Sequence, residues 1–150
     1  MTATLAGQVA LVTGAGRRSG IGYAIARRLA ALGARLVVTD LAPPGAGGPP
    51  AELAAIAASL PAVDAPHLAV AADVGSPDDV ARLVETTVAQ CGRLDILVNN
   101  AGVCITRPLL DATLAEWELT MRVNAQSVFL LGVAAARQMI AQGGGSIVNM

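Results

Sequence analysis

A glycine-rich turn between an apolar strand and a helix limits most strongly what this chain can fold into. Residues Val9 to Val12 are all apolar, as is typical of a parallel strand that is buried on both faces. Glycines follow at 14, 16, 20 and 22, and a helical pattern then continues through Tyr23 to Leu29. Glycine allows positive φ and close backbone approach, and a helix N-terminus offers free N–H groups to an anion. The stretch therefore predicts a site for the pyrophosphate of a dinucleotide.

The spacing of these glycines differs from two common phosphate-binding motifs. Counted from Gly14, the Gly-x-Gly-x-x-Gly pattern needs a glycine where this chain has Ser19. The Walker loop needs a lysine after Gly20, and none is present there. On the motif alone, a glycine-rich turn that binds no ligand stays an alternative.

Strand and helix patterns alternate along the rest of the chain, which predicts an α/β domain with a doubly wound parallel sheet. Ser76 and Pro77 are typical of a helix start, Gly92 of a helix end, and Thr113 with Glu116 of a capping box. The predicted strands after the first are 35–39, 67–72, 94–98 and 146–150, and the later helices are 51–60, 76–91 and 113–142.

Polar or flexible residues follow several of the predicted strands. They are Gly14, Asp40, Asp73 and Asn100. Open parallel sheets bind ligands at the carboxyl ends of their strands, so we expect these residues to surround one site. Asp40, at the tip of the second strand, can accept hydrogen bonds from the 2′- and 3′-hydroxyls of an adenosine ribose.

Composition narrows the classes of partner. The net charge of −1 argues against nucleic acid and anionic membranes as partners. The longest apolar run, Val128 to Ala136, is too short for a membrane span. Cys91 and Cys104 match no metal-binding spacing, so we expect free thiols, no metal site and a cytoplasmic protein.

Several motifs together resemble the short-chain dehydrogenase/reductase family over essentially the whole chain. The matching stretches are Thr13-Gly14, Gly20-Ile21-Gly22 after two extra residues, Asp73-Val74, Asn99-Asn100-Ala101-Gly102, Val123-Asn124 and Ser146 to Asn149. The resemblance implies a Rossmann-type sheet and a nicotinamide dinucleotide as cofactor.

The resemblance also assigns expected roles to single residues. The turn would hold the pyrophosphate, with the Ile21 N–H as a donor. Asp40 would bind the ribose, and Asn124 would correspond to the catalytic asparagine, whose backbone shapes the helix around a water of the proton relay. The expected cofactor-binding residues are Gly14, Arg18, Ser19, Gly20, Ile21, Gly22, Asp40, Asp73, Val74, Asn100, Ala101 and Gly102.

The choice between NAD and NADP depends on opposing charges. Arg17 and Arg18 lie in the turn, where a basic side chain can meet a 2′-phosphate. Asp40 opposes this, because a carboxylate close to a phosphate is repelled, whereas the hydroxyls of NAD can be hydrogen-bonded. We therefore expect NAD, with NADP as the alternative.

The family reaction transfers a hydride between nicotinamide and a secondary alcohol or ketone, with substrates of the 3-oxoacyl, sugar or polyol type. It uses a Ser, a Tyr and a Lys. This chain contains no Lys, and its one Tyr, Tyr23, lies in the first helix. We expect residues 1–150 to be a cofactor-binding domain truncated inside its fifth strand, without the family's C-terminal strands and helices and inactive alone.

Other expectations concern partners and competing functions. Relatives commonly assemble as homodimers or tetramers through the long helix, and we expect this of the complete protein. A non-catalytic nucleotide-binding fragment or pseudoenzyme is one alternative. An S-adenosylmethionine methyltransferase, which also has a glycine-rich first turn, is another, although the run from Asn99 to Gly102 argues against it.

Overall fold

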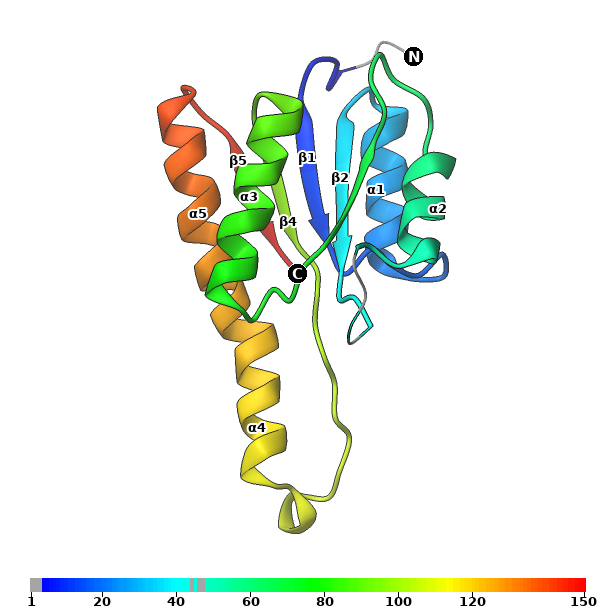
Figure 1. The fold of residues 1–150 in the computed structure, drawn as a ribbon. Coiled ribbons are helices and arrows are strands. Elements are labelled where there is room, and N and C mark those ends of the chain that lie inside the picture. The colour runs from blue at the N-terminus through cyan, green and yellow to red at the C-terminus, as the bar shows by residue number, and fades with distance from the viewer. Residues whose placement is uncertain (1–3, 44, 46–47) are drawn as a thin grey trace.

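The computed structural model describes residues 4–43, 45 and 48–150, which form a parallel sheet with helices on both faces (Figure 1). The strand order is β3-β2-β1-β4-β5, as expected for a doubly wound sheet. The strands are β1 (Val9–Thr13), β2 (Arg35–Asp40), β3 (Leu68–Ala71), β4 (Ile96–Asn99) and β5 (Ser146–Asn149). The helices are α1 (Ile21–Ala31), α2 (Ala51–Ser59), α3 (Pro77–Cys91), α4 (Leu114–Met121) and α5 (Ser127–Ala141), with a 3₁₀ turn η1 (Leu109–Asp111) and a π segment η2 (Arg122–Gln126).

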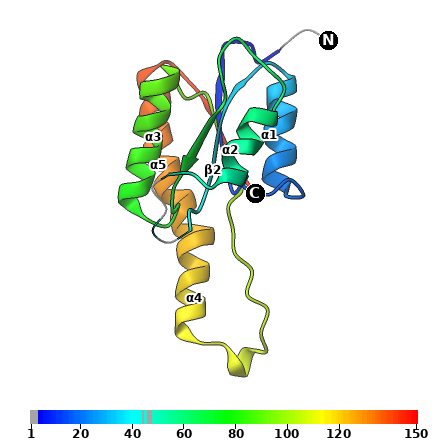
Figure 2. The same cartoon turned by 45° about the vertical axis from the view of Figure 1, so that its right-hand side comes forward.

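Alternate residues of the central strands enter two separate cores. Leu11 of β1 faces α3 and α5, while its neighbour Val12 faces α1 and α2. Figures 1 and 2 show these two helix pairs on opposite faces of the sheet. All five residues of β1 are buried, which explains why the strand is apolar without alternation.

The helix boundaries follow local signals in the sequence. Ser76 caps α3 through a hydrogen bond from the Asp79 N–H, and Gly92 ends that helix in the left-handed region at φ 81°. Thr113 and Glu116 form the predicted capping box at the start of α4. The predicted starts of these helices are therefore confirmed.

The predicted single helix over 113–142 has a more complex structure. It consists of α4, the π segment η2 and α5, and α4 projects beyond the carboxyl ends of the strands (Figure 1). Many apolar side chains of α4 and α5 are exposed, including Trp117 of α4 at 62% and Phe129 of α5 at 68%. By length and composition alone, the stretch Leu114–Ala141 could cross a membrane, which is weak evidence because helices of soluble proteins pass the same test.

Candidate cofactor site

The carboxyl ends of the strands surround a cavity of about 690 Å³. Most of the residues predicted to bind cofactor lie around it, since parallel strands bring their ends to one edge of the sheet. The lining residues are Gly14, Arg17, Gly20, Ile21, Asp40, Leu41, Ala72, Asp73, Val74, Asn100, Ala101, Gly102, Val103, Leu119, Arg122 and Val123.

The glycine turn forms a cradle in which side chains have no room. Gly14 has φ +65°, and a Cβ there would lie 2.8 Å from the Ala101 Cα. A Cβ on Gly22 would lie 2.5 Å from the Gly14 carbonyl oxygen. Helix α1 starts at Ile21 without a side-chain cap and without an acidic residue in its first turn. Its first N–H groups therefore face the turn free of a side-chain acceptor, which fits a pyrophosphate.

Asp40 closes the turn from the second strand. Its Oδ2 accepts the Gly16 N–H at 2.7 Å, and its Oδ1 accepts the Leu41 N–H at 2.8 Å. A Cβ on Gly16 would lie only 2.6 Å from Asp40 Oδ2, so position 16 also requires glycine. Each carboxylate oxygen keeps a second lone pair, so Asp40 can still accept hydrogen bonds from ribose hydroxyls.

Asn100 and Thr13 join the ends of the two central strands. The Asn100 side chain donates to the carbonyl oxygens of Thr13 at 2.8 Å and Gly14 at 3.2 Å. The Thr13 hydroxyl accepts the backbone N–H groups of Asn100 at 3.0 Å and Ala101 at 2.9 Å. These bonds fix the glycine turn against the loop after β4. The sequence argument did not single out Thr13 for this role.

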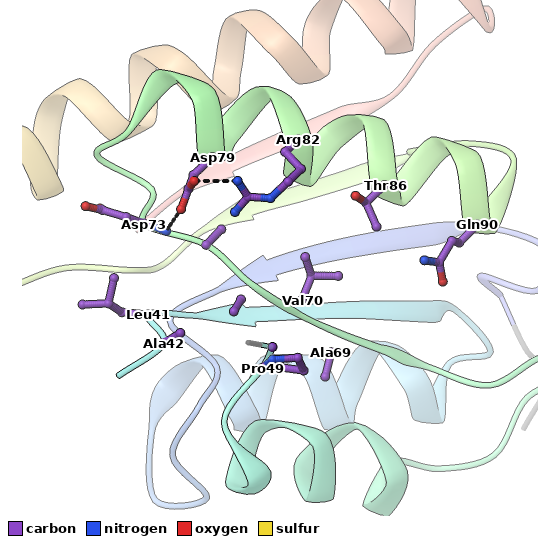
Figure 3. A pocket seen from close by; sticks show the side chains of 13 residues that line it. Leu41, Ala42, Pro49, Ala69, Val70, Asp73, Asp79, Arg82, Thr86 and Gln90 are labelled. Carbon is purple, nitrogen blue, oxygen red and sulfur yellow. Dashed lines mark hydrogen bonds and ion pairs between the residues drawn. The ribbon is translucent and has the colours of Figure 1, made fainter. Parts of the chain in front are cut away.

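A second cavity, of about 570 Å³, adjoins the first along the outer side of β3 (Figure 3). The two share Leu41, Ala72 and Asp73, but the second contains no residue of the glycine turn. In Figure 3, Asp79 points back from α3 toward the backbone of Asp73, whose N–H it accepts at 2.8 Å. Asp79 therefore supports the wall between the cavities.

Arg82 donates to Asp79 at 2.8 Å, and this bond, with the bond from the Asp73 N–H, holds the pKa of Asp79 below its ordinary value. Folding thus favours the ionised form. The contribution of the ionised Asp79 to the stability of the fold is fully present above the ordinary aspartate pKa of about 4. It is lost as the pH falls through the lowered pKa of the folded state.

Asp79→Asn should lower the free energy of unfolding by about 1 kcal/mol at pH 7, the scale of a partly exposed charged hydrogen bond. The difference from the parent should shrink below about pH 4. Urea unfolding across this range measures it. Asp78→Asn, in the same first turn of α3, is the control for the helix dipole. An equal loss in both variants at every pH would contradict the prediction.

Asn124 lies in the π segment η2 and holds the loop after β4. Its Oδ1 accepts the Val103 N–H at 2.8 Å, and its Nδ2 donates to the Val103 carbonyl oxygen at 2.8 Å. Both groups of the amide are thus engaged with one backbone position, which makes Asn124 a positioning residue in this structure. π segments are rare and often mark functional sites.

The two arginines of the turn lie in different surroundings. Arg17 lines the cavity. Arg18 turns toward α2, where it donates to the Ser59 hydroxyl at 3.1 Å and to the Ala55 carbonyl oxygen at 3.3 Å, and it stacks 5.8 Å from the Tyr23 ring centroid. Arg18, Ser19 and Gly22 are not among the lining residues, so the structure does not bring these three predicted residues to the cavity wall. Gly22 instead packs closely against Gly14 and Asn100.

Within the described ranges, no group of three or more His, Cys, Asp or Glu side chains could hold a metal ion. The fold and the site together define an α/β domain with a cavity at the carboxyl ends of its parallel strands, where open sheets of this kind bind ligands.

The sequence matches the family of short chain dehydrogenases over residues 8–150, and the chain belongs to this family. It is 41% identical over 146 residues to a D-threitol dehydrogenase of Mycolicibacterium smegmatis, covering 97% of this chain and 53% of that protein. It is 39% identical over 150 residues to a 3-oxoacyl-[acyl-carrier-protein] reductase of Synechocystis sp., covering 100% of this chain and 57% of that protein. The chain thus spans about half the length of these relatives.

Solved structures share both fold and sequence with the chain. A metagenomic short-chain oxidoreductase in complex with NADP has a TM-score of 0.84 and 40% identity, covering 97% of this chain and 62% of that one. A short chain dehydrogenase from Mycobacterium smegmatis has a TM-score of 0.86 and 36% identity, with 98% and 59% covered. Family membership removes the methyltransferase alternative.

Proposed function

We propose that residues 1–150 form a domain that binds a nicotinamide dinucleotide at the carboxyl ends of the strands. The observation that carries this proposal is the uncapped start of α1 above a glycine cradle, with Asp40 beside it. The backbone N–H groups of the turn would hold the pyrophosphate, and Asp40 would hold the ribose hydroxyls. A calorimetric titration of the chain with NADH tests the proposal. The absence of a heat of binding to folded protein would refute it.

The bound dinucleotide supplies or accepts a hydride, and the substrate class we propose is a secondary alcohol or ketone of the polyol, sugar or 3-oxoacyl type. The names of the D-threitol dehydrogenase and the 3-oxoacyl reductase relatives support this class. Asn124, through its hold on Val103, would shape the nicotinamide end of the cavity. Because the chain has no Lys and Tyr23 lies in α1, we expect nucleotide binding by these residues without turnover.

The same expectation fits the alternative of a non-catalytic nucleotide-binding module. Oxidation of NADH with a carbonyl substrate by the 150-residue chain alone would rule out that module. We also propose that the protein is cytoplasmic, where free thiols such as those of Cys91 and Cys104 are typical. The stretch Leu114–Ala141 would not span a membrane, because Arg122 and Asn124 in its middle are bonded to the loops after β3 and β4. The exposed apolar side chains of α4 and α5 support assembly into homo-oligomers.

NAD is the dinucleotide we propose, because Asp40 lies where the 2′-phosphate of NADP would be repelled. Two unit charges about 4 Å apart at an effective dielectric of 20 repel by about 4 kcal/mol. Arg17 lines the cavity and is the residue that could offset this repulsion. One related structure contains NADP, so the preference must be measured in this chain.

Asp40→Asn should shift the ratio of NAD to NADP affinity toward NADP by about 100-fold, or about 2.7 kcal/mol. The asparagine oxygen can still accept the Gly16 N–H that holds the turn, while the exposed Leu41 N–H, which loses its acceptor, can bond to water. Calorimetric Kd values for both nucleotides provide the ratio. Asp111→Asn, on the exposed turn η1, is the matched control for net charge. A ratio that Asp40→Asn leaves unchanged would remove the charge argument for NAD.

A further inference from the structure

Arg122 lies on the wall of the cofactor cavity and pairs with Asp73 across the fold. Its Nη1 donates to Asp73 Oδ2 at 2.8 Å, from a position 49 residues later in the sequence. The other carboxylate oxygen of Asp73 accepts the Gly75 N–H at 2.8 Å. Each oxygen thus has its own donor, and the two donors together fix the direction in which the carboxylate faces the cavity.

The stem of Arg122 also fits closely against the turn after Asp73. A Cβ on Gly75 would lie 2.9 Å from the Arg122 Cγ and 3.0 Å from its Nη1. Gln126, one turn further along η2, reaches the Gly75 carbonyl oxygen at 3.5 Å. The π segment therefore contacts this turn through both packing and hydrogen bonds.

Arg122 and Asn124 connect the π segment to two loops that line the cavity. Arg122 holds the turn after β3, and Asn124 holds Val103 in the loop after β4. A shift of either loop would have to move η2. The short segment thus links the part of the cavity next to Asp73 to the part next to Val103.

The ion pair is poorly suited to stabilising the fold, since its side chains are 42% and 31% exposed. Pairs of this kind add little to stability because water screens them. At the cavity wall, however, the guanidinium offsets the negative charge of Asp73, which would otherwise oppose a ligand that carries phosphates. The pair is therefore better placed to affect binding than folding.

We propose that Arg122 is a positioning residue for the adenosine half of the dinucleotide, acting by holding and neutralising the Asp73 carboxylate. This inference rests on the nucleotide binding proposed above. Arg122→Met keeps much of the stem that packs on Gly75 and removes the charge.

The 150-residue Arg122→Met chain should bind ADP-ribose and NAD about tenfold more weakly than the parent, by calorimetry. The two losses should be equal, because the change concerns the half that both ligands share. Arg122→Lys should restore part of the affinity, since a lysine retains the charge without the planar guanidinium. Arg93→Met is the matched control. It removes a half-exposed arginine that pairs with Asp95 at 2.7 Å, before the start of β4 and away from the cofactor cavity, and its affinity should equal that of the parent.

A double-mutant cycle with Asp73→Asn tests whether Arg122 acts through the Asp73 carboxylate. In the Asp73→Asn background, Arg122→Met should lower the nucleotide affinity little further. A loss that persists undiminished in that background, or an equal loss in Arg93→Met, would overturn the inference. Without nucleotide, hydrogen exchange of the Gly75 amide should quicken in Arg122→Met, and unchanged exchange would also overturn it. If the parent chain bound neither ligand, the proposed function would fail and the inference with it. Normal parent binding with unaltered Arg122→Met affinity would refute the inference alone.

Discussion

Gly22→Ala is expected to abolish measurable binding of nicotinamide dinucleotides. The new Cβ would lie 2.5 Å from the Gly14 carbonyl oxygen and 2.7 Å from the Asn100 amide nitrogen, so the cradle must open. Because Asn100 ties the turn to the end of β4, the displacement would move the start of α1 relative to Asp40. We expect an affinity loss of at least about 100-fold, and a fall in the free energy of unfolding of about 1–3 kcal/mol.

Calorimetry and urea unfolding measure these two quantities separately. Gly132→Ala is the matched control, because Gly132 lies in α5 with negative φ and nothing within 4 Å of an added Cβ. That variant should bind like the parent and be more stable by up to about 1 kcal/mol, from helix propensity. Unchanged affinity in Gly22→Ala would show that the glycine turn does not form the site.

Asp95→Ala should produce the second large effect, on stability and not on binding. Asp95 is 8% exposed and lies at the opposite end of the sheet from the cavity. It accepts the Val9 N–H at 2.8 Å and two bonds from Arg93 at 2.7 Å each. Removing the carboxylate leaves the buried Val9 N–H without its acceptor, while Arg93, which is half exposed, can turn to water. We expect a loss of about 2–3 kcal/mol.

Urea unfolding gives the size of this loss, and Asp95→Asn should lose less because its amide oxygen can still accept from Val9. Glu85→Ala, at an exposed position of α3, controls for loss of a carboxylate and should change stability by less than about 0.5 kcal/mol. The nucleotide Kd of the folded Asp95→Ala chain should equal that of the parent. A stability equal to the parent's would mean that Asp95 does not hold β1 in place.

The local signals in the sequence were sufficient to predict most of the elements and the edge at which the cavity lies, but not the π segment within the predicted helix over 113–142. The caps at Ser76 and Thr113 and the turn at Gly92 involve residues within a few positions of one another. The run from Val9 to Val12 also predicted a buried strand, because a strand that is buried on both faces is apolar at consecutive positions. Once the alternation of strands and helices was known, Gly14, Asp40, Asp73 and Asn100 had to meet at one edge.

The tertiary structure alone decided which side chains complete the site. Arg17 and Arg18 are adjacent and chemically identical, yet a contact 41 residues away draws Arg18 to Ser59 and leaves Arg17 at the cavity. The ion pair of Arg122 with Asp73 spans 49 residues, and the bond of Asp95 to Val9 spans 86. Capping and strand burial depend on the identities of nearby residues, so they can be predicted from the sequence. The partner of a long side chain depends on which distant residues tertiary packing brings close to it. The residues that surround it in the sequence do not determine this.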